Sequence, residues 1–173
     1  MTKTEIIQKL RDVKLLALDF DGIMTNGMVY TDQDGRETVL CSRKDGLGVD
    51  MLKRHGIKIY VISKETNRVV AARCKKLRIP HVQAIKDSEG KLEILQRLAH
   101  DAGFVQHQIV YMGDDLNDVA PLKWAGVGIT VSDAHSYIRT IANYITEARG
   151  GDHAIREVAE LLLRARDVKL DEF

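Results

Sequence analysis

Two carboxylates stand at the end of an apolar run near the beginning of the chain. In LLALDFDGIM, residues 15–24, four apolar residues lead into Asp19, one aromatic residue follows, and Asp21 and Gly22 come next. An ionised carboxylate in an apolar setting costs several kcal/mol unless a cation or hydrogen-bond donors replace the lost water. We therefore expect Asp19 and Asp21 to face a cation, a reacting group or both.

Three further stretches place reactive residue types after apolar runs. They are ISKE at 62–65 with Ser63, Lys91 at the beginning of a predicted helix, and GDDLND at 113–118 with Asp114. Taken alone, each of the four stretches has a simpler interpretation. DFDG is typical of a surface turn, Ser63 of a helix N-cap, Lys91 of a solvated side chain and GDDLND of an acidic loop that caps a helix. Because ligands bind at the carboxyl ends of strands in an open α/β sheet, the four stretches together predict one site.

Short apolar runs alternate with longer stretches of helical periodicity. Buried strands are predicted at 13–18, 57–63, 82–85, 109–112 and 127–131. This alternation predicts an α/β fold with a parallel sheet, right-handed crossovers and helices on both faces. The segment 27–40 departs from it, because two β-rich arms surround Asp34-Gly35, a turn pair typical of hairpins. A β-hairpin is therefore expected to project directly after the first strand.

Length and composition narrow the classes of function. A chain of 173 residues with 45% hydrophobic content can close one core, so a single domain is expected over 1–173. The 26 Lys and Arg balance 25 Asp and Glu, which indicates no partner among nucleic acids or membranes. No run approaches the ~18 apolar residues of a membrane span, and the N-terminus lacks an apolar export signal. Cys41 and Cys74 form no CxxC motif, so we expect a reduced, cytoplasmic protein without a disulfide framework or zinc site.

The order of these motifs resembles that of the haloacid dehalogenase superfamily of phosphohydrolases, over essentially the whole chain. The gaps from Asp21 to Ser63 and from Ser63 to Lys91 leave no room for an inserted cap domain, so the resemblance is to the capless members, with a Rossmann-like three-layer α/β/α fold. DGIMTNG, RKDGLGV, VSDAH and GGDHAIRE resemble motifs of phosphatases for 3-deoxy-D-manno-octulosonate 8-phosphate or for nine-carbon, sialic-acid-like 9-phosphates. The last motif usually reads GGxGAxRE, so His153 replaces a glycine and puts the conformation of that loop in doubt.

The resemblance implies a role for each carboxylate. Asp19 matches the nucleophile that forms an aspartyl-phosphate, and Asp21 matches the acid/base that protonates the sugar alkoxide and then activates water. Asp19, the backbone carbonyl of Asp21 and Asp114 would hold Mg²⁺, a hard cation that favours oxygen donors. Either Asp115 or Asp118 would hold the side chain of Lys91 in place.

Two further positions match groups that bind the transferred phosphate. Ser63 would donate a hydrogen bond to a phosphoryl oxygen, and Lys91 would supply a positive charge near it. A protein released from catalysis has no reason to keep all of these residues. The alternative of a non-catalytic oligomerisation or binding module with the same fold is therefore disfavoured, and a macromolecular substrate is left open.

The stretch SKETNRVVAARCKKL, residues 63–77, bears on the choice of sugar acid. Octulosonate enzymes usually read Thr-Gly-Arg where this chain has Ser63-Lys64-Glu65, and the acidic Glu65 resembles the nine-carbon branch and the phosphatase-like domain of acylneuraminate cytidylyltransferases. We therefore favour a nine-carbon substrate over the eight-carbon one, with Gly22, Lys64 and Glu65 in contact with it. Basic positions matching Arg73 and Lys76 help to hold the substrate carboxylate in that branch, often across a subunit boundary. The alternative is a solvated basic face on a helix over 66–77.

The hairpin bears on assembly. An isolated two-stranded ribbon is marginally stable in water, so its apolar residues Met28, Tyr30, Val39 and Leu40 need partners. The resemblance points to a homotetramer in which hairpins associate and one subunit closes the next one's site. The favoured function is a Mg²⁺-dependent sugar-acid phosphatase in the biosynthesis of a surface sugar such as that of lipopolysaccharide.

Overall fold

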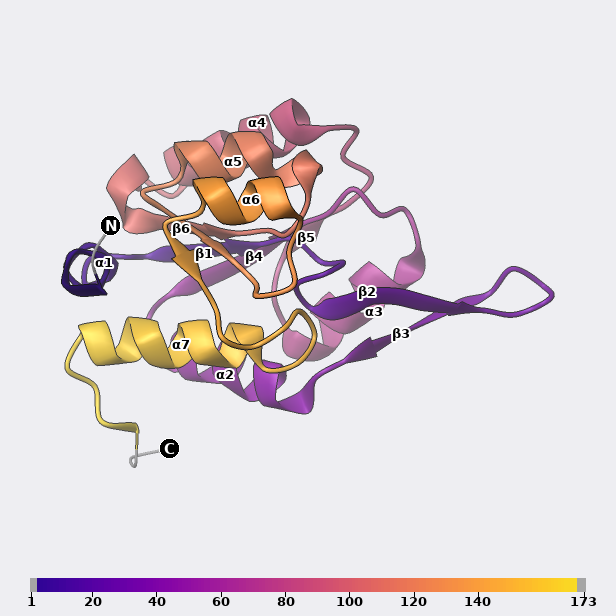
Figure 1. The fold of residues 1–173 in the computed structure, drawn as a ribbon, viewed down its shortest axis with the longest axis horizontal. Coiled ribbons are helices and arrows are strands. Elements are labelled where there is room, and N and C mark those ends of the chain that lie inside the picture. Colours follow the sequence, from indigo (N-terminus) through magenta and orange to yellow (C-terminus); the bar gives the residue numbers. More distant parts are fainter. Residues whose placement is uncertain (1–2, 171–173) are drawn as a thin grey trace.

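A six-stranded parallel sheet forms the centre of the molecule (Figure 1). The computed structural model describes residues 3–170. The strand order is β5-β4-β1-β6-β7-β8, and each neighbouring pair is parallel. The strands are β1 (Leu15–Leu18), β4 (Lys58–Ile62), β5 (His81–Val82), β6 (Ile109–Met112), β7 (Val127–Thr130) and β8 (Tyr144–Ile145). Strands β4, β1 and β6 are therefore neighbours whose carboxyl ends meet at one edge.

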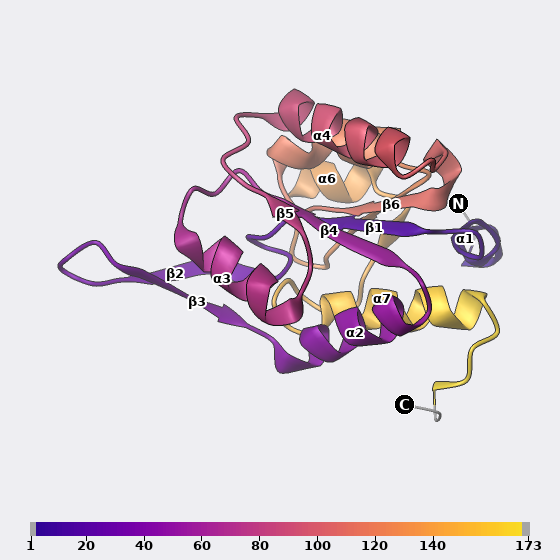
Figure 2. The same ribbon diagram turned by 180° about the vertical axis from the view of Figure 1, so that it is seen from behind.

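Helices cover both faces of this sheet. Figure 1 shows α4, α5 and α6 on one face and α2 and α7 on the other, and Figure 2 shows the same layers from behind. The helices are α1 (Lys3–Leu10), α2 (Arg43–Arg54), α3 (Arg68–Leu77), α4 (Ser88–Asp101), α5 (Val119–Trp124), α6 (Ser136–Ile141) and α7 (Ala154–Ala165). The predicted three-layer α/β/α architecture is confirmed.

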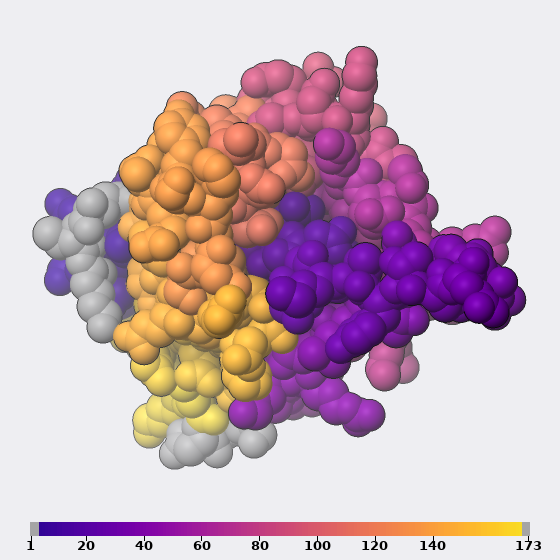
Figure 3. Space-filling view, turned by 45° about the vertical axis from the view of Figure 1, so that its right-hand side comes forward, coloured from indigo at the N-terminus to yellow at the C-terminus, as the bar shows by residue number. Residues whose placement is uncertain are grey.

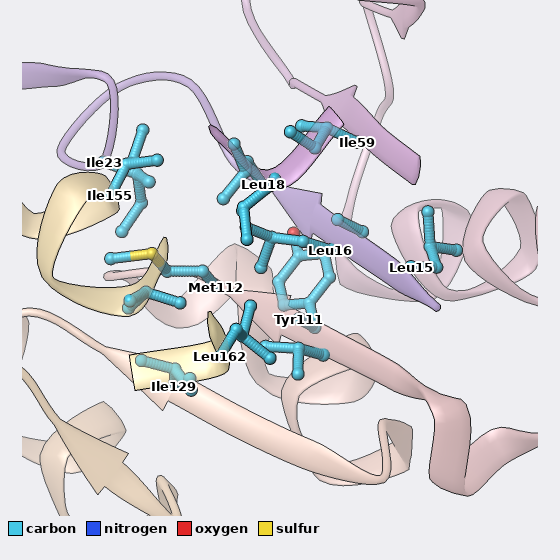
Figure 4. Close-up of a cluster of buried hydrophobic side chains, with 14 of the residues drawn as sticks. Leu15, Leu16, Leu18, Ile23, Ile59, Tyr111, Met112, Ile129, Ile155 and Leu162 are labelled. Atoms are coloured by element: carbon cyan, nitrogen blue, oxygen red, sulfur yellow. The ribbon is translucent and has the colours of Figure 1, made fainter. Parts of the chain in front are cut away.

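The core lies between the sheet and the helices. Every side chain of β1, β6 and β7 is buried, which explains why these strands read as continuous apolar runs rather than alternating ones. Figure 4 shows the cluster where β1 and β6 meet α7, with Leu16 and Met112 from the strands and Ile155 and Leu162 from the helix. Burying this apolar surface fixes the strands whose ends carry the polar residues.

The hairpin consists of β2 (Thr25–Thr31) and β3 (Glu37–Cys41), paired antiparallel and projecting from the body. Its turn is organised by Asp32, whose carboxylate accepts hydrogen bonds from the backbone N–H groups of Asp34 and Arg36, each over 2.9 Å. Gly35 has a φ of 74°, a conformation that glycine adopts without strain. The predicted hairpin is thus confirmed, with both arms slightly longer than the pattern indicated.

The structure departs from the predicted elements in three places. Strand β5 ends at Val82 because Ala84, with a φ of 63°, turns the chain away from the sheet. The N–H groups of Ala84 and Ile85 donate instead to the carbonyls of Glu65 and Ser63. Strand β8 has only two residues and no apolar run to indicate it. The stretch GDDLND does not lead directly into an α-helix, because a 3₁₀ turn, Leu116–Asp118, precedes α5.

Among residues 3–170, none of the helices is long and apolar enough to cross a membrane.

Candidate active site

A cavity of about 390 Å³ opens where β1, β4 and β6 end. Figure 3 shows this end of the molecule, with the purple hairpin projecting beside it. Polar side chains dominate the lining, which consists of Asp19, Asp21, Gly27, Ser63, Lys64, Glu65, Thr66, Asp114, Asp115 and Asn117. A larger cavity of about 720 Å³ lies beside the amino-terminal half of β4 and is lined mostly by apolar residues. The smaller cavity is therefore the candidate active site, because its lining carries the reactive side chains.

Asp19 and Lys91 form an ion pair at the floor of this cavity. Asp19 directly follows β1, and its N–H donates to the carbonyl of Met112 over 2.9 Å. The Lys91 Nζ reaches in from α4 and lies 2.9 Å from Asp19 Oδ2, with the lysine side chain fully buried. Burial alone would lower the pKa of Lys91, but the carboxylates of Asp19 and Asp118 outweigh it and raise this pKa. Lys91 therefore carries its positive charge beside Asp19.

Asp118, not Asp115, holds Lys91. The Oδ1 atom of Asp118 accepts hydrogen bonds from Lys91 Nζ over 2.7 Å and from the Tyr111 hydroxyl over 2.6 Å. Its Oδ2 accepts from the backbone N–H groups of Asp114 and Asp115. The Asp115 carboxylate instead accepts from the N–H of Leu116 over 2.7 Å. Sequence reasoning missed Tyr111, because a tyrosine within an apolar strand carries no signal for a polar contact.

Asp114 completes an acidic cluster beside Asp19. One carboxylate oxygen each of Asp19, Asp114 and Asp118 lie within 4.8 Å of one another. Four donors engage the Asp118 oxygens, and Asp118 does not line the cavity. Asp19 accepts from only two of its described neighbours, the Phe20 N–H and Lys91, and it lines the cavity together with Asp114, so these two residues offer the carboxylates within reach of a cation. Gly22 permits this arrangement, because a Cβ atom there would lie 2.0 Å from Asp114 Oδ2. Its predicted contact with substrate stays a prediction.

The charges of this cluster call for a cation. Burial, then the neighbouring carboxylates of Asp118 and Asp115, raise the pKa of Asp114 to about 7. Burial and Asp118 likewise raise the pKa of Asp19, although Lys91 opposes them. Carboxylates this close oppose each other's ionisation unless a positive charge lies between them. A hard divalent ion such as Mg²⁺, which prefers oxygen donors, fits these residues.

Asp21 is a half-buried residue of the cavity lining. Its Oδ1 accepts a hydrogen bond from the Thr25 hydroxyl over 3.3 Å, and the same hydroxyl oxygen accepts from the N–H groups of Gly22 and Gly27. Burial, then the carboxylate of Glu65, raise the pKa of Asp21. A carboxyl group with a raised pKa suits proton transfer near neutral pH. Thr25 was also missed, although its place in the apolar IMT segment hints at a buried polar contact.

The segment after β4 lines one side of the cavity. Ser63 is buried, and its hydroxyl oxygen accepts from the Glu65 N–H over 3.0 Å, which leaves the hydroxyl proton available to a ligand. Lys64 is exposed at the lining. The Glu65 carboxylate accepts from the N–H groups of Thr66 and Asn67, so local backbone donors hold it at the beginning of α3.

Arg73 and Lys76 do not line this cavity. The Arg73 Nη2 donates to the carbonyl of Ser42 over 2.7 Å, which ties α3 to the beginning of α2. Lys76 is exposed on α3. Within one chain, the structure thus brings Asp19, Asp21, Ser63, Lys64, Glu65, Lys91 and Asp114 together and leaves these two basic residues outside. Their contact with substrate across a subunit boundary stays a prediction.

Known proteins resemble this chain in both sequence and fold. A family model described as haloacid dehalogenase-like hydrolase matches residues 51–157. The chain belongs to this hydrolase family. The 3-deoxy-D-manno-octulosonate 8-phosphate phosphatase of Escherichia coli K12 is 32% identical to this hydrolase over 168 residues, which cover 97% of this chain and 88% of the relative.

Two solved structures also resemble this hydrolase. The 3-deoxy-D-manno-octulosonate 8-phosphate phosphatase of Moraxella catarrhalis, in complex with magnesium, phosphate and the sugar acid, is 37% identical, with a TM-score of 0.90 and coverage of 95% and 93%. The cobalt-bound phosphatase of the same substrate from Haemophilus influenzae is 28% identical, with a TM-score of 0.86 and 92% coverage of each chain. Family and relatives together identify this hydrolase as a phosphoric monoester hydrolase.

Proposed function

We propose that this hydrolase is a Mg²⁺-dependent phosphatase of a 2-keto-3-deoxy sugar acid, with 3-deoxy-D-manno-octulosonate 8-phosphate as its substrate. The observation that carries the proposal is the buried Lys91 beside Asp19, with Asp114 next to them in a polar cavity. Relatives with this named activity align over nearly the whole chain. They favour the eight-carbon substrate over the nine-carbon one indicated by Glu65.

Asp19 acts as the nucleophile in the first step. A bond forms between its carboxylate oxygen and phosphorus while the bond from phosphorus to the sugar oxygen breaks. Protonated Asp21 donates its proton to the departing oxygen, so the sugar leaves as an alcohol. Ser63 and Lys91 bind the phosphoryl oxygens, and Lys91 also offsets their negative charge. The product on the chain is an aspartyl-phosphate.

Water completes the reaction in the second step. Asp21, now a carboxylate, takes a proton from a water molecule whose oxygen attacks phosphorus. The bond from phosphorus to Asp19 breaks, which releases inorganic phosphate and restores both side chains. Asp19 and Asp114, with the Asp21 backbone carbonyl, would hold Mg²⁺, which supplies Lewis-acid stabilisation of the phosphoryl charge.

The direct test is phosphate release from a substrate panel. Purified full-length chain is assayed with 3-deoxy-D-manno-octulosonate 8-phosphate and with nine-carbon 9-phosphates, in Mg²⁺ and after chelation. We expect the highest kcat/KM for the eight-carbon ester, with activity lost on chelation and restored by Mg²⁺. Hydrolysis of a phosphoprotein but of no sugar phosphate would contradict the proposal and favour a macromolecular substrate.

A nine-carbon substrate is the second candidate, because Glu65 lies at the cavity wall. Its carboxylate stands near Asp21 and can accept hydrogen bonds from hydroxyl groups of a longer sugar chain. A Glu65→Gln variant removes the charge and keeps the size. If the nine-carbon ester is the substrate, this change will lower its kcat/KM more than that of the eight-carbon ester.

The assembly that fits this function is a cytoplasmic homotetramer. Met28, Tyr30 and Leu40 on the hairpin are exposed, and the cavity beside them is open to solvent within one chain. Association of hairpins would cover both surfaces. Light scattering at assay concentration tests this, and an active monomer would contradict it.

A further inference from the structure

The loop after β7 holds two separate parts of the site. His135 in this loop donates its backbone N–H to the carbonyl of Asp114 over 2.9 Å. Two residues earlier, Asp133 Oδ1 accepts from the N–H of Gly150 over 3.0 Å, and its Oδ2 pairs with Arg149 Nε over 3.1 Å. One short loop therefore anchors both the metal-site aspartate and the turn that precedes α7.

The turn at Gly150 and Gly151 rests on the segment between β1 and β2. A Cβ atom at Gly150 would lie 1.8 Å from the carbonyl oxygen of Gly22, and one at Gly151 would lie 2.5 Å from the Asn26 nitrogen. The Gly151 N–H also donates to the carbonyl of Ile23 over 3.0 Å. Only glycine permits so close an approach, so the position of the turn determines the position of the peptide at Gly22.

These contacts form a closed series around the site. The Asp114 carbonyl contacts the loop after β7, this loop contacts the Gly150 turn, and the Gly150 turn contacts Gly22. A Cβ atom at Gly22 would lie 2.0 Å from the Asp114 carboxylate, which closes the series. The peptide that follows Asp21 is thereby fixed relative to Asp114.

We propose that Asp133 is a positioning residue for the metal site. By anchoring the Gly150 turn, it keeps Asp21 and Asp114 at the separation that a bound divalent cation requires. Asp133 is not among the residues that line the cavity, so its effect is indirect. Residues that orient ligands from outside the coordination sphere typically change metal affinity by about 10- to 100-fold when removed. The inference rests on the proposed Mg²⁺ dependence.

The fold does not depend on Asp133 alone. The Ser132 hydroxyl donates to the carbonyl of Ala148 over 3.1 Å, and the Glu157 carboxylate of α7 accepts from the Ala148 N–H over 2.9 Å. The segment before the turn thus keeps other anchors when Asp133 is changed. An Asp133→Ala chain is therefore expected to fold, with Gly150 less firmly held.

The test is calorimetric titration of the full chain with Mg²⁺, together with turnover of p-nitrophenyl phosphate. We expect Asp133→Ala to weaken Mg²⁺ binding about tenfold or more. Its kcat should fall most at limiting Mg²⁺, with little change in KM. Asp133→Asn keeps an acceptor for the Gly150 N–H and should recover most of the affinity. Asp167→Asn is the matched control, because Asp167 pairs with Arg11 over 2.6 Å at the exposed surface.

Two results separate the positioning role from the proposed function. Wild-type Mg²⁺ affinity in Asp133→Ala, with only a lower Tm, would overturn the positioning role alone. Absence of Mg²⁺ binding by the wild-type chain would overturn the proposed function and the positioning role with it. If Asp133→Ala does not fold, Gly150→Ala displaces the Gly22 carbonyl directly, and unchanged Mg²⁺ affinity there would also overturn the role. None of these readouts depends on the identity of the sugar.

Discussion

The buried site and the projecting hairpin satisfy their side chains in opposite ways. In the site, Lys91 has carboxylate oxygens at 2.7 and 2.9 Å, and Asp118 uses both of its oxygens within the chain. On the hairpin, Met28 and Tyr30 are exposed to 70% and 77% of their surface. The chain thus pairs its buried lysine with its own carboxylates but leaves apolar surface uncovered beside the cavity.

The physical reason lies in the different costs of exposure and burial. A buried charge without its partner costs several kcal/mol, so the buried Lys91 must find its carboxylate partners within the folded chain. Exposed apolar side chains cost less and can be covered later by another molecule. The two regions are joined where Asn67 Nδ2 donates to Glu37 Oε2 over 2.9 Å and where Thr25, the first residue of β2, contacts Asp21. Changes at the hairpin can therefore reach the cavity.

The largest effect is expected from Asp19→Asn. The amide is nearly the same size as the carboxylate but is a very poor nucleophile, so phosphate release should be abolished. Circular dichroism and the Tm check that the fold persists. Retention of about a tenth of wild-type kcat/KM, a loss of only ~1.4 kcal/mol in transition-state stabilisation, would remove Asp19 from the role of nucleophile.

Lys91→Met tests whether the buried ion pairs of Lys91 are needed for the stability of the fold. Two carboxylates would lose their buried cation, so the free energy of unfolding should fall by about 3–5 kcal/mol. Urea denaturation in chelator measures this, and kcat should fall as well. Lys123→Met is the control, because that lysine is exposed and its ammonium group contacts the ring and hydroxyl of Tyr137 rather than a buried carboxylate. Equal stability of the two variants would show that the ion pair is dispensable.

Deleting the hairpin tip, residues 31–36, tests whether the exposed hairpin serves assembly and covers the cavity. The site keeps all of its charged groups, so kcat should change little. Assembly should loosen and KM should rise, because the cavity loses its cover. Light scattering and steady-state kinetics measure the two effects. A parallel loss of kcat at unchanged KM would instead indicate that the hairpin acts on the catalytic groups through Thr25.

The pH dependence of stability distinguishes the metal-free site from the loaded one. With its pKa raised to about 7, Asp114 keeps in the folded state a proton that the unfolded chain has already released. Stability of the metal-free chain should therefore fall as pH rises from about 4 to 7. The raised pKa of Asp21 acts in the same direction.

Excess Mg²⁺ should reduce this loss, because the cation stabilises the ionised carboxylates. Tm measured from pH 5 to 8 with chelator and with Mg²⁺ gives the comparison, and Asp114→Asn serves as the control with a smaller slope. A Tm that rises with pH in chelator would contradict the assignment.

The smallest effect is expected at His153, in neither of the two regions. His153 adopts a φ of 74° directly before α7, the conformation that the usual glycine of this motif accommodates without strain. His153→Gly should therefore raise the free energy of unfolding by about 0.5–1 kcal/mol. Loss of the exposed contact with Asp152 changes this little. A Tm increase of about 2–4 °C corresponds to 1 kcal/mol, and unchanged kcat/KM is expected.

The C-terminal segment extends beyond the described part of the chain. The segment RDVKLDEF, residues 166–173, carries no assigned role, and residues 171–173 lie outside the described residues. The tetramer, the single domain over 1–173 and the nine-carbon preference stay predictions.

The sequence by itself determined the sheet, the hairpin and the meeting of Asp19, Ser63, Lys91 and Asp114. Apolar runs indicate buried parallel strands, and parallel strands bring their carboxyl ends to one edge, so residues just after each run must be neighbours. Local turn chemistry was equally informative at Asp34-Gly35. The strands and the hairpin turn depend on the residues of short segments, so they can be predicted from the local sequence pattern.

Only the tertiary structure decided the partners of these residues. Asp115 and Asp118 stand three residues apart, and the 3₁₀ turn between them directs one carboxylate to Lys91 and the other to a backbone N–H. The contacts of Tyr111 with Asp118 and of Gly150 with Gly22 join segments whose separation no local pattern encodes. Side-chain direction and close backbone approach are set when the whole chain packs, which is why they could not be read from residue types and spacing.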